Sequence, residues 1–92
     1  MGRNKLKAAV KTEIFEYWQK KCAYCGESLH RCGTLDHVVP RSKGGATHKK
    51  NLIACCFACN ISKSSRPWLE WFREQEFWEP FREDAVRVWL DC

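Results

Sequence analysis

Two pairs of cysteines, each separated by two residues, constrain this chain more than any other feature. The pairs are Cys22/Cys25 and Cys56/Cys59, and residues 26–55 lie between them. Each C-x-x-C turn brings two thiolates to one side, and two such turns complete a tetrahedral zinc site with Zn–S bonds of about 2.3 Å. The spacing therefore predicts that the chain folds around one zinc ion held by these four cysteines.

This zinc site is expected to be structural. Four thiolate ligands leave no open position for water. A chain of 92 residues buries only about two thirds of its unfolded surface, and a structural zinc contributes on the order of 10 kcal/mol to folding. The alternative is a redox dithiol or disulfide pair, but seven cysteines are an odd number for a disulfide framework. Cys55 has Ala58 three residues later, so we expect it to be a small buried residue.

The sequence also indicates in which cellular compartment the protein is expected. The N-terminal segment is charged and amphipathic and lacks the apolar run of a signal peptide. No segment approaches the ~20 apolar residues of a membrane span. We therefore expect a reducing cytoplasm, in which paired C-x-x-C motifs are typical of metal sites, and no membrane partner.

Charge is distributed unevenly along the chain. Residues 1–66 carry 13 Lys or Arg against four acids, whereas residues 67–92 carry three Arg against seven acids. A basic surface favours a polyanionic partner, because neutralising phosphates releases counterions. A solvated lysine-rich face would have the same composition, so charge alone does not establish nucleic-acid binding.

Periodicity and turn residues predict an α+β fold in a single domain, residues 1–92. An amphipathic helix is expected at about 5–20, since apolar residues recur there every four positions. A β-rich run at 35–39 is stopped by Pro40, and residues 52–54 supply a return strand. Helical pattern follows at 55–63. Two further helices are expected within 66–91, with Trp68, Trp71 and Phe72 on one stripe and Phe81, Ala85, Val88 and Trp89 buried.

The residues between and beside the cysteine pairs resemble the HNH endonuclease family. The resemblance rests on the stretch LDHVVPRSKGG at 35–45, on Asn51-Leu52, and on Cys56-Phe57-Ala58-Cys59-Asn60. It covers residues 22–66, about half of the chain. It implies a small ββα-metal core stapled by the four-cysteine zinc site, with the N-terminal helix and two C-terminal helices added, and it implies DNA as the substrate.

The resemblance also implies a role for each motif residue. His37 matches the family's general base, and Asn51 matches the asparagine that braces the loop and helps orient that histidine. Asp36 and Asn60 match the ligands of a single catalytic ion. A carboxylate and an amide oxygen suit Mg²⁺ or Mn²⁺. Because Asn60 is a neutral ligand, binding is expected to be weak, and Mn²⁺ or Ni²⁺ could outperform Mg²⁺.

Three further residues are candidates for phosphate contacts. Arg41 and Lys63 could neutralise nearby phosphates, whereas His48 could contact phosphate but is more simply explained as an exposed loop residue. A geometric condition also applies, because adjacent residues of a regular strand face opposite sides. Asp36 and His37 can address one phosphate only if the strand twists, bulges or ends there.

Two other functions remain open from the sequence. One is a non-catalytic zinc-knuckle module that binds nucleic acid through its basic face, and the other is a redox or zinc-storage protein. Neither needs the motif residues at these spacings. No recognition module accompanies the motif, so targeting could depend on a partner protein, and the aromatic-rich tail leaves a homodimer open.

Overall fold

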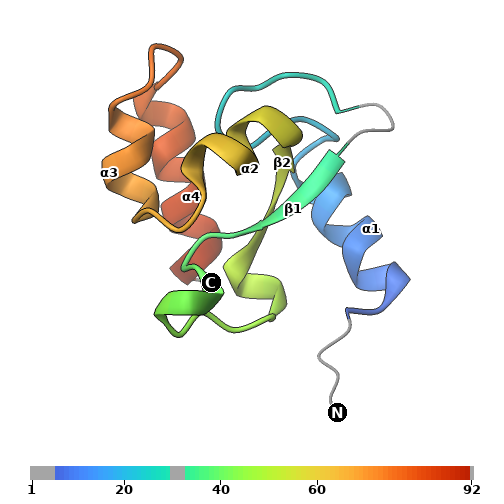
Figure 1. The fold of residues 1–92 in the computed structure, drawn as a ribbon. Coiled ribbons are helices and arrows are strands. Elements are labelled where there is room, and N and C mark those ends of the chain that lie inside the picture. The colour runs from blue at the N-terminus through green and yellow to red at the C-terminus, as the bar shows by residue number, and fades with distance from the viewer. Residues whose placement is uncertain (1–5, 30–32, 92) are drawn as a thin grey trace.

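The computed structural model describes residues 6–29 and 33–91 and confirms the α+β class (Figure 1). In chain order the helices and strands are α1 (Ala8–Tyr17), β1 (Gly33–His37), β2 (Leu52–Cys56), α2 (Phe57–Lys63), α3 (Trp68–Arg73) and α4 (Pro80–Asp91). Two short 3-10 helices, η1 (Arg41–Lys43) and η2 (Lys49–Asn51), lie between the strands. The predicted ββα core is therefore formed by β1, β2 and α2.

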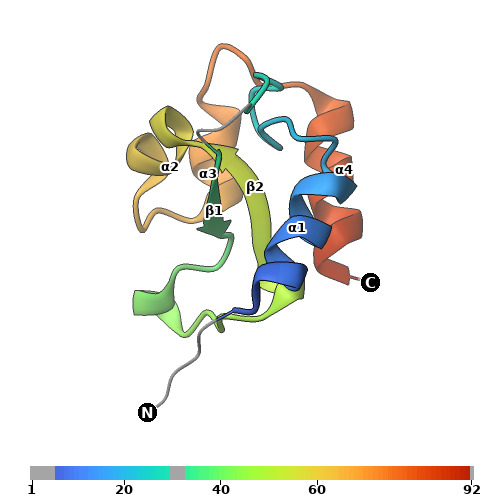
Figure 2. The same ribbon diagram turned by 90° about the vertical axis from the view of Figure 1, so that its right-hand side faces the viewer.

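The two strands form an antiparallel hairpin that runs through the middle of the molecule. Its register pairs Gly33 with Cys56 and His37 with Leu52. Figure 2 shows α2 and α3 on one side of the hairpin and α1 and α4 on the other. Because both sides are covered, residues 52–55 of β2 are all buried. This explains why β2 consists of consecutive apolar residues instead of an alternating pattern.

The strand β1 ends at His37, two residues earlier than the sequence pattern predicts. The loop that follows turns sharply at two glycines. Gly44 has a φ of 88°, a left-handed conformation that favours glycine, and a Cβ at Gly45 would lie 1.7 Å from the Val39 carbonyl oxygen. The loop is therefore compact, and it folds back beside the end of β1.

The helix α1 is shorter than the predicted helix at about 5–20. It ends at Tyr17, and the chain then leaves the helical conformation because Gln19 and Lys20 adopt φ values of 59° and 56°. These two residues redirect the chain toward the first cysteine pair. The predicted start at residue 5 lies outside the described residues, as do His30, Cys32 and Cys92.

The C-terminal helices supply much of the aromatic core. Trp71, Phe72 and Trp89 are buried, and the indole nitrogen of Trp89 donates a 2.8 Å hydrogen bond to the Leu52 carbonyl oxygen. The tail thereby packs against the hairpin, as its helical spacing predicted. Across residues 6–29 and 33–91, no helix combines the length and the apolar character needed to cross a membrane.

The predicted buried face of α4 is partly wrong. Phe81 and Val88 are 60% and 54% exposed, whereas Val86 is completely buried. The helix begins at Pro80 and turns Glu83, Val86 and Trp89 toward the core. These residues recur every three positions, and an i, i+3 row is as valid a helix face as the i, i+4 row assumed from the sequence.

Candidate functional site

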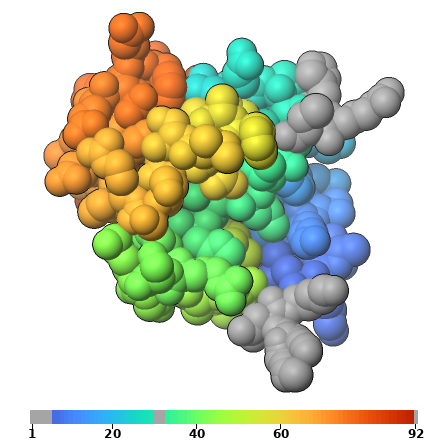
Figure 3. Space-filling model, in the orientation of Figure 1, coloured from blue at the N-terminus to red at the C-terminus, as the bar shows by residue number. Residues whose placement is uncertain are grey.

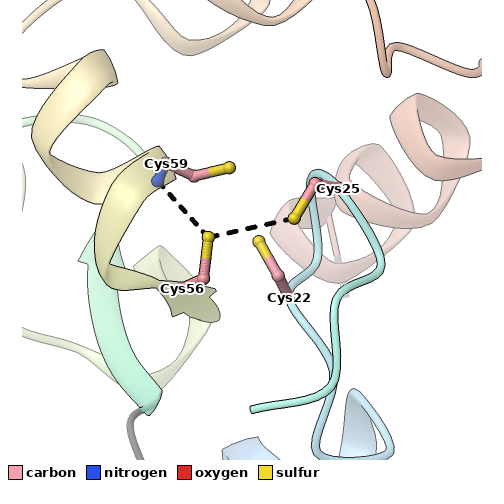
Figure 4. Close-up of side chains that lie close together, drawn as sticks. All are labelled: Cys22, Cys25, Cys56 and Cys59. Atoms are coloured by element: carbon pink, nitrogen blue, oxygen red, sulfur yellow. Dashed lines mark hydrogen bonds between the residues drawn. The ribbon is translucent and has the colours of Figure 1, made fainter.

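The four predicted zinc ligands converge in space. Their sulfur atoms all lie within 4.8 Å of one another, and the Cys25 and Cys56 sulfurs are 3.8 Å apart. A tetrahedral site with bonds of about 2.3 Å separates its sulfurs by roughly 3.8 Å. In Figure 4 the sulfurs point into one common space from two separate segments of the chain. The cluster fits a structural zinc ion.

Backbone contacts hold each cysteine pair in place. Gly26, at a φ of 79°, donates a 2.9 Å hydrogen bond to the Cys22 carbonyl and closes the first turn. The Cys56 sulfur caps α2 by accepting a 3.3 Å bond from the Cys59 amide. Local hydrogen bonds therefore hold both pairs of sulfur atoms in the arrangement that a zinc ion needs.

Cys55 lies beside this cluster but belongs to the core. It is completely buried, as predicted, and its thiol donates to the Cys56 carbonyl oxygen at 3.3 Å. The four-cysteine cluster identified among the described residues does not include it. Its thiol also neighbours that of Cys22, which does belong to the cluster.

The motif residues meet at a groove on a different part of the surface. This open groove has a volume of about 310 Å³ and is lined by Asp36, His37, Arg41, Asn60 and their neighbours. Figure 3 shows the face on which α2, the loop after β1 and the segment before α3 come together. The structure thus brings a carboxylate, an imidazole, an amide and a guanidinium to one cavity.

His37 is the last residue of β1 and is half-buried at the groove. Its Nε2 atom lies 3.0 Å from the Thr47 hydroxyl. Burial lowers the pKa of the imidazole below its usual value, and the positive charges of Arg41 and Lys63 lower it further. The imidazole is therefore neutral at physiological pH, the form in which it can accept a proton.

Asp36 is buried, and two other side chains contact its carboxylate. The Tyr24 hydroxyl donates to Oδ2 at 2.8 Å, and the Lys63 ammonium lies 3.3 Å from Oδ1. Burial raises the pKa of this carboxyl above its usual value, although Lys63 and Tyr24 oppose the shift. A carboxylate offers about four lone-pair positions, so two remain free for a further ligand.

Lys63 lies in the interior, where a lysine requires a partner. Its side chain is fully buried, and its ammonium also donates to the His37 carbonyl oxygen at 3.1 Å. The sequence suggested a phosphate contact, but in the structure the ammonium faces the backbone and carboxylate of β1. One signal could have indicated this: Lys63 follows Asn60 by three residues and so shares its face of α2.

Tyr24 is a functional candidate that the sequence did not suggest. It lies between the two cysteines of the first pair and is completely buried. Burial raises the pKa of its hydroxyl well above the usual value, and the neighbouring Asp36 carboxylate adds to this effect. The hydroxyl therefore stays protonated and acts as a donor. No local pattern indicates a contact with a residue 12 positions away.

Asn51 does not line the groove, but its side chain hydrogen-bonds to the loop that follows His37. Its Oδ1 accepts a 2.9 Å bond from the Val39 amide, and its Nδ2 donates to the carbonyls of Val39 at 3.0 Å and Ala46 at 2.9 Å. These three bonds connect the two ends of the loop that follows His37. The side chain is well placed to hold the loop in one conformation.

Asn60 approaches the groove from α2. Its Nδ2 donates to the Thr34 hydroxyl at 3.0 Å and to the Leu35 carbonyl oxygen at 3.3 Å. Because the nitrogen is used as a donor toward β1, the amide oxygen is the atom available as a ligand. Asn60 and Asp36 together provide two oxygen donors of the kind that hard divalent ions prefer.

The two remaining phosphate candidates differ in position. Arg41 is exposed and lines the groove, where it can meet a phosphate. His48 is exposed as well, but its Nδ1 accepts a 3.3 Å bond from the Lys50 amide and caps η2. It is not among the residues that line the groove. Its position agrees with the simpler expectation of an exposed loop residue.

Comparison with known proteins identifies similarity to endonucleases. The family model described as HNH endonuclease matches residues 22–66. The CRISPR-associated endonuclease Cas9 of Actinomyces naeslundii is 38% identical over an alignment of 65 residues that covers 67% of this chain and 6% of that protein. The Cas9 of Corynebacterium diphtheriae is 42% identical over an alignment of 53 residues that covers 55% of this chain and 5% of the relative.

The fold has a counterpart among solved structures. The crystal structure of the Type II-C Cas9 enzyme from Actinomyces naeslundii matches 98% of this chain with a TM-score of 0.63 and 23% identity. The matched region is 11% of the solved chain. This chain therefore spans only a small part of the length of the proteins it resembles, and the structural likeness concerns the fold.

Proposed function

Because residues 22–66 belong to the HNH endonuclease family, we propose that this chain hydrolyses DNA phosphodiester bonds with one divalent metal ion. The observation that carries the proposal is the groove itself. A neutral imidazole, two oxygen donors and an exposed guanidinium line one open cavity of about 310 Å³. The relatives are named endonucleases, which is consistent with this chemistry.

In this proposal, His37 is the general base. A lowered imidazole pKa keeps the ring in its neutral form, so it can take a proton from the attacking water. The 3.0 Å contact with Thr47 supports one orientation of the ring. The Lys63 bond to the His37 carbonyl restrains the backbone at the same position.

Asp36 and Asn60 are the proposed ligands of the catalytic ion, with Mg²⁺ or Mn²⁺ as the expected species and Ni²⁺ as a candidate. Their residue types fit such an ion, because one carboxylate and one amide oxygen leave positions for water and phosphate. A bound ion would neutralise charge on the scissile phosphate and stabilise the leaving oxygen. The nearby positive charge of Lys63 weakens the attraction for a cation, so binding is expected to be weak.

The other residues support the reaction without taking part in it directly. Asn51 holds the loop after His37 through its three hydrogen bonds. Arg41, exposed at the groove, contacts a DNA phosphate in this proposal. A zinc ion bound by Cys22, Cys25, Cys56 and Cys59 would hold α2 and the first cysteine turn together within the single domain that the sequence predicts.

Plasmid cleavage tests the proposal. Zinc-loaded protein is incubated with supercoiled DNA in Mg²⁺, Mn²⁺, Ni²⁺ or EDTA, beside the variant His37→Ala. We expect nicking that requires a divalent ion and is lost in the variant, while the zinc content and circular dichroism spectrum stay unchanged. Nicked and linear products also report whether one or both strands are cut, which depends on whether the chain dimerises.

A binding module without catalysis predicts a different result. In that case folded, zinc-loaded protein would shift DNA on a gel yet cut it with none of the ions. The His37→Ala variant would then behave like the wild type in every assay. This outcome would replace the nuclease with a zinc-knuckle module that binds nucleic acid.

A further inference from the structure

Tyr24 connects the zinc cluster to the proposed catalytic groove. Its backbone lies between Cys22 and Cys25, and its hydroxyl donates a 2.8 Å hydrogen bond to Oδ2 of Asp36. Both side chains are buried. One residue of the cysteine turn is therefore in direct contact with the carboxylate proposed to hold the catalytic ion.

The Tyr24 ring is buried and packs against two other aromatic rings. It forms T-shaped pairs with Trp71 and Phe72, whose ring centroids are 4.9 Å and 5.1 Å away. The preceding residue, Ala23, donates a 2.9 Å backbone bond to the Ala54 carbonyl in β2. Because ring and backbone are both held, the hydroxyl has little freedom to leave Asp36.

The carboxylate of Asp36 is oriented by two donors that come from different segments. Tyr24 occupies one oxygen, and Lys63 of α2 contacts the other. Only the lone pairs that these donors leave free can face an ion in the groove. Loss of either donor would let the carboxyl group turn, since each bond constrains a different oxygen.

We propose that Tyr24 is a positioning residue that holds the Asp36 carboxylate in the orientation in which it binds the catalytic ion. The first cysteine pair then serves the catalytic groove as well as the fold, because it carries this hydroxyl. The inference rests on the proposed function, in which Asp36 is a metal ligand. Through this contact, the cysteine turn controls the affinity of Asp36 for the catalytic ion.

The variant Tyr24→Phe tests this proposal, because it removes only the hydroxyl group that contacts Asp36. Phenylalanine keeps the ring that packs against Trp71 and Phe72. The matched control is Tyr17→Phe, since Tyr17 is the only other tyrosine and its side chain is 48% exposed. Zinc content and thermal unfolding are measured first, and Mn²⁺ binding to the zinc-loaded proteins is then followed by electron paramagnetic resonance and by cleavage at increasing Mn²⁺.

We expect Tyr24→Phe to retain one zinc ion and to bind Mn²⁺ about 10- to 100-fold more weakly than the wild type, as typical for loss of an outer-shell partner. The Mn²⁺ concentration that gives half-maximal cleavage should rise by the same factor. Tyr17→Phe should match the wild type. Equal Mn²⁺ affinity and equal cleavage in Tyr24→Phe and wild type would overturn the inference and leave the proposed function intact.

The failure of the proposed function would look different. In that case the wild type itself would neither bind Mn²⁺ at Asp36 nor cut DNA, and the inference would fall with it. If Tyr24→Phe loses zinc, fluorotyrosine placed at position 24 in the Tyr17→Phe protein provides a second measurement. Its ¹⁹F resonance should shift when Mg²⁺ is added, and a resonance unchanged at saturating Mg²⁺ in a cleaving protein would overturn the inference.

Discussion

The ammonium group of Lys63 lies 3.3 Å from the carboxylate of Asp36, and neither side chain is appreciably exposed. A lysine that would normally extend into solvent is thus held inside the molecule by an acid 27 residues earlier in the chain. The pair joins α2 to β1 immediately behind the groove. Each charge compensates the cost of burying the other, so the pair affects both the stability of the fold and the charge near the groove.

Replacing Lys63 should be strongly destabilising. Lys63→Met leaves the Asp36 charge buried without its cation, and breaking a buried pair in this way costs about 3–5 kcal/mol. Urea unfolding of the zinc-loaded protein measures the change. Lys49→Met is the matched control, because the Lys49–Glu13 pair at 2.6 Å is partly exposed and such pairs contribute only about 0–1 kcal/mol. Equal unfolding free energies for the two variants would contradict this prediction.

Removal of zinc should unfold the protein. The cluster joins the turn after α1 to the end of β2 and the start of α2, and a chain of this size has a small core. We expect Cys22→Ser and complete chelation to abolish the helical circular dichroism signal. Cys55→Ala should keep one zinc ion per chain, since Cys55 lies outside the cluster. An unchanged spectrum after full zinc removal would show that the fold does not depend on the metal.

The pH dependence of cleavage should follow the titration of His37. Its pKa is lowered, first by burial and then by the charges of Arg41 and Lys63. The neutral base therefore persists below the ordinary value of about 6.5, and activity is lost only as the pH falls through the lowered pKa. NMR titration of the His37 ring, compared with the cleavage rate at saturating metal, checks this.

Replacing Arg41 tests whether nearby positive charge lowers the pKa of His37. The variant Arg41→Gln removes one positive charge near the imidazole, so the pKa of His37 should rise and the acid limb of the rate profile should move to higher pH. A cleavage rate that stays constant through the measured titration of His37 would contradict its role as the base. A downward shift in Arg41→Gln would contradict the electrostatic cause.

Asn51 should matter for activity more than for stability. Asn51→Ala loses all three loop bonds, two of them donated by its Nδ2 and one accepted by its Oδ1. We expect cleavage to fall by at least about tenfold, because a small misplacement of catalytic groups is costly. The free energy of unfolding should fall by roughly 1–2 kcal/mol, since exposed hydrogen bonds are individually weak.

The variant Asn51→Asp separates the contributions of the two atoms. Aspartate can still accept from the Val39 amide but cannot donate to the Val39 and Ala46 carbonyls. The carboxylate oxygen that replaces Nδ2 is repelled by these two carbonyl oxygens, so activity should fall at least as far as in Asn51→Ala. Wild-type cleavage rates in both variants would show that cleavage does not depend on the hydrogen bonds between Asn51 and the loop.

The sequence by itself determined the local parts of this protein. The spacing of the cysteines predicted two turns that face each other, and the motif from Asp36 to Asn60 predicted a hairpin followed by a helix. Such features depend on neighbouring residues, so periodicity and turn chemistry are enough to find them. The alternation of side chains along a strand also required the strand to twist, bulge or end near His37, and β1 ends there.

Only the tertiary structure decided which side chains surround the carboxylate of Asp36. Lys63 was expected at the surface and is buried, and Tyr24 had no assigned role yet donates to Asp36. The predicted buried face of α4 was likewise partly wrong, because Val86 lies in the core and Val88 is exposed. These outcomes depend on how β1, α2 and the cysteine turn pack together, because contacts across 12 and 27 residues leave no periodic trace in the chain.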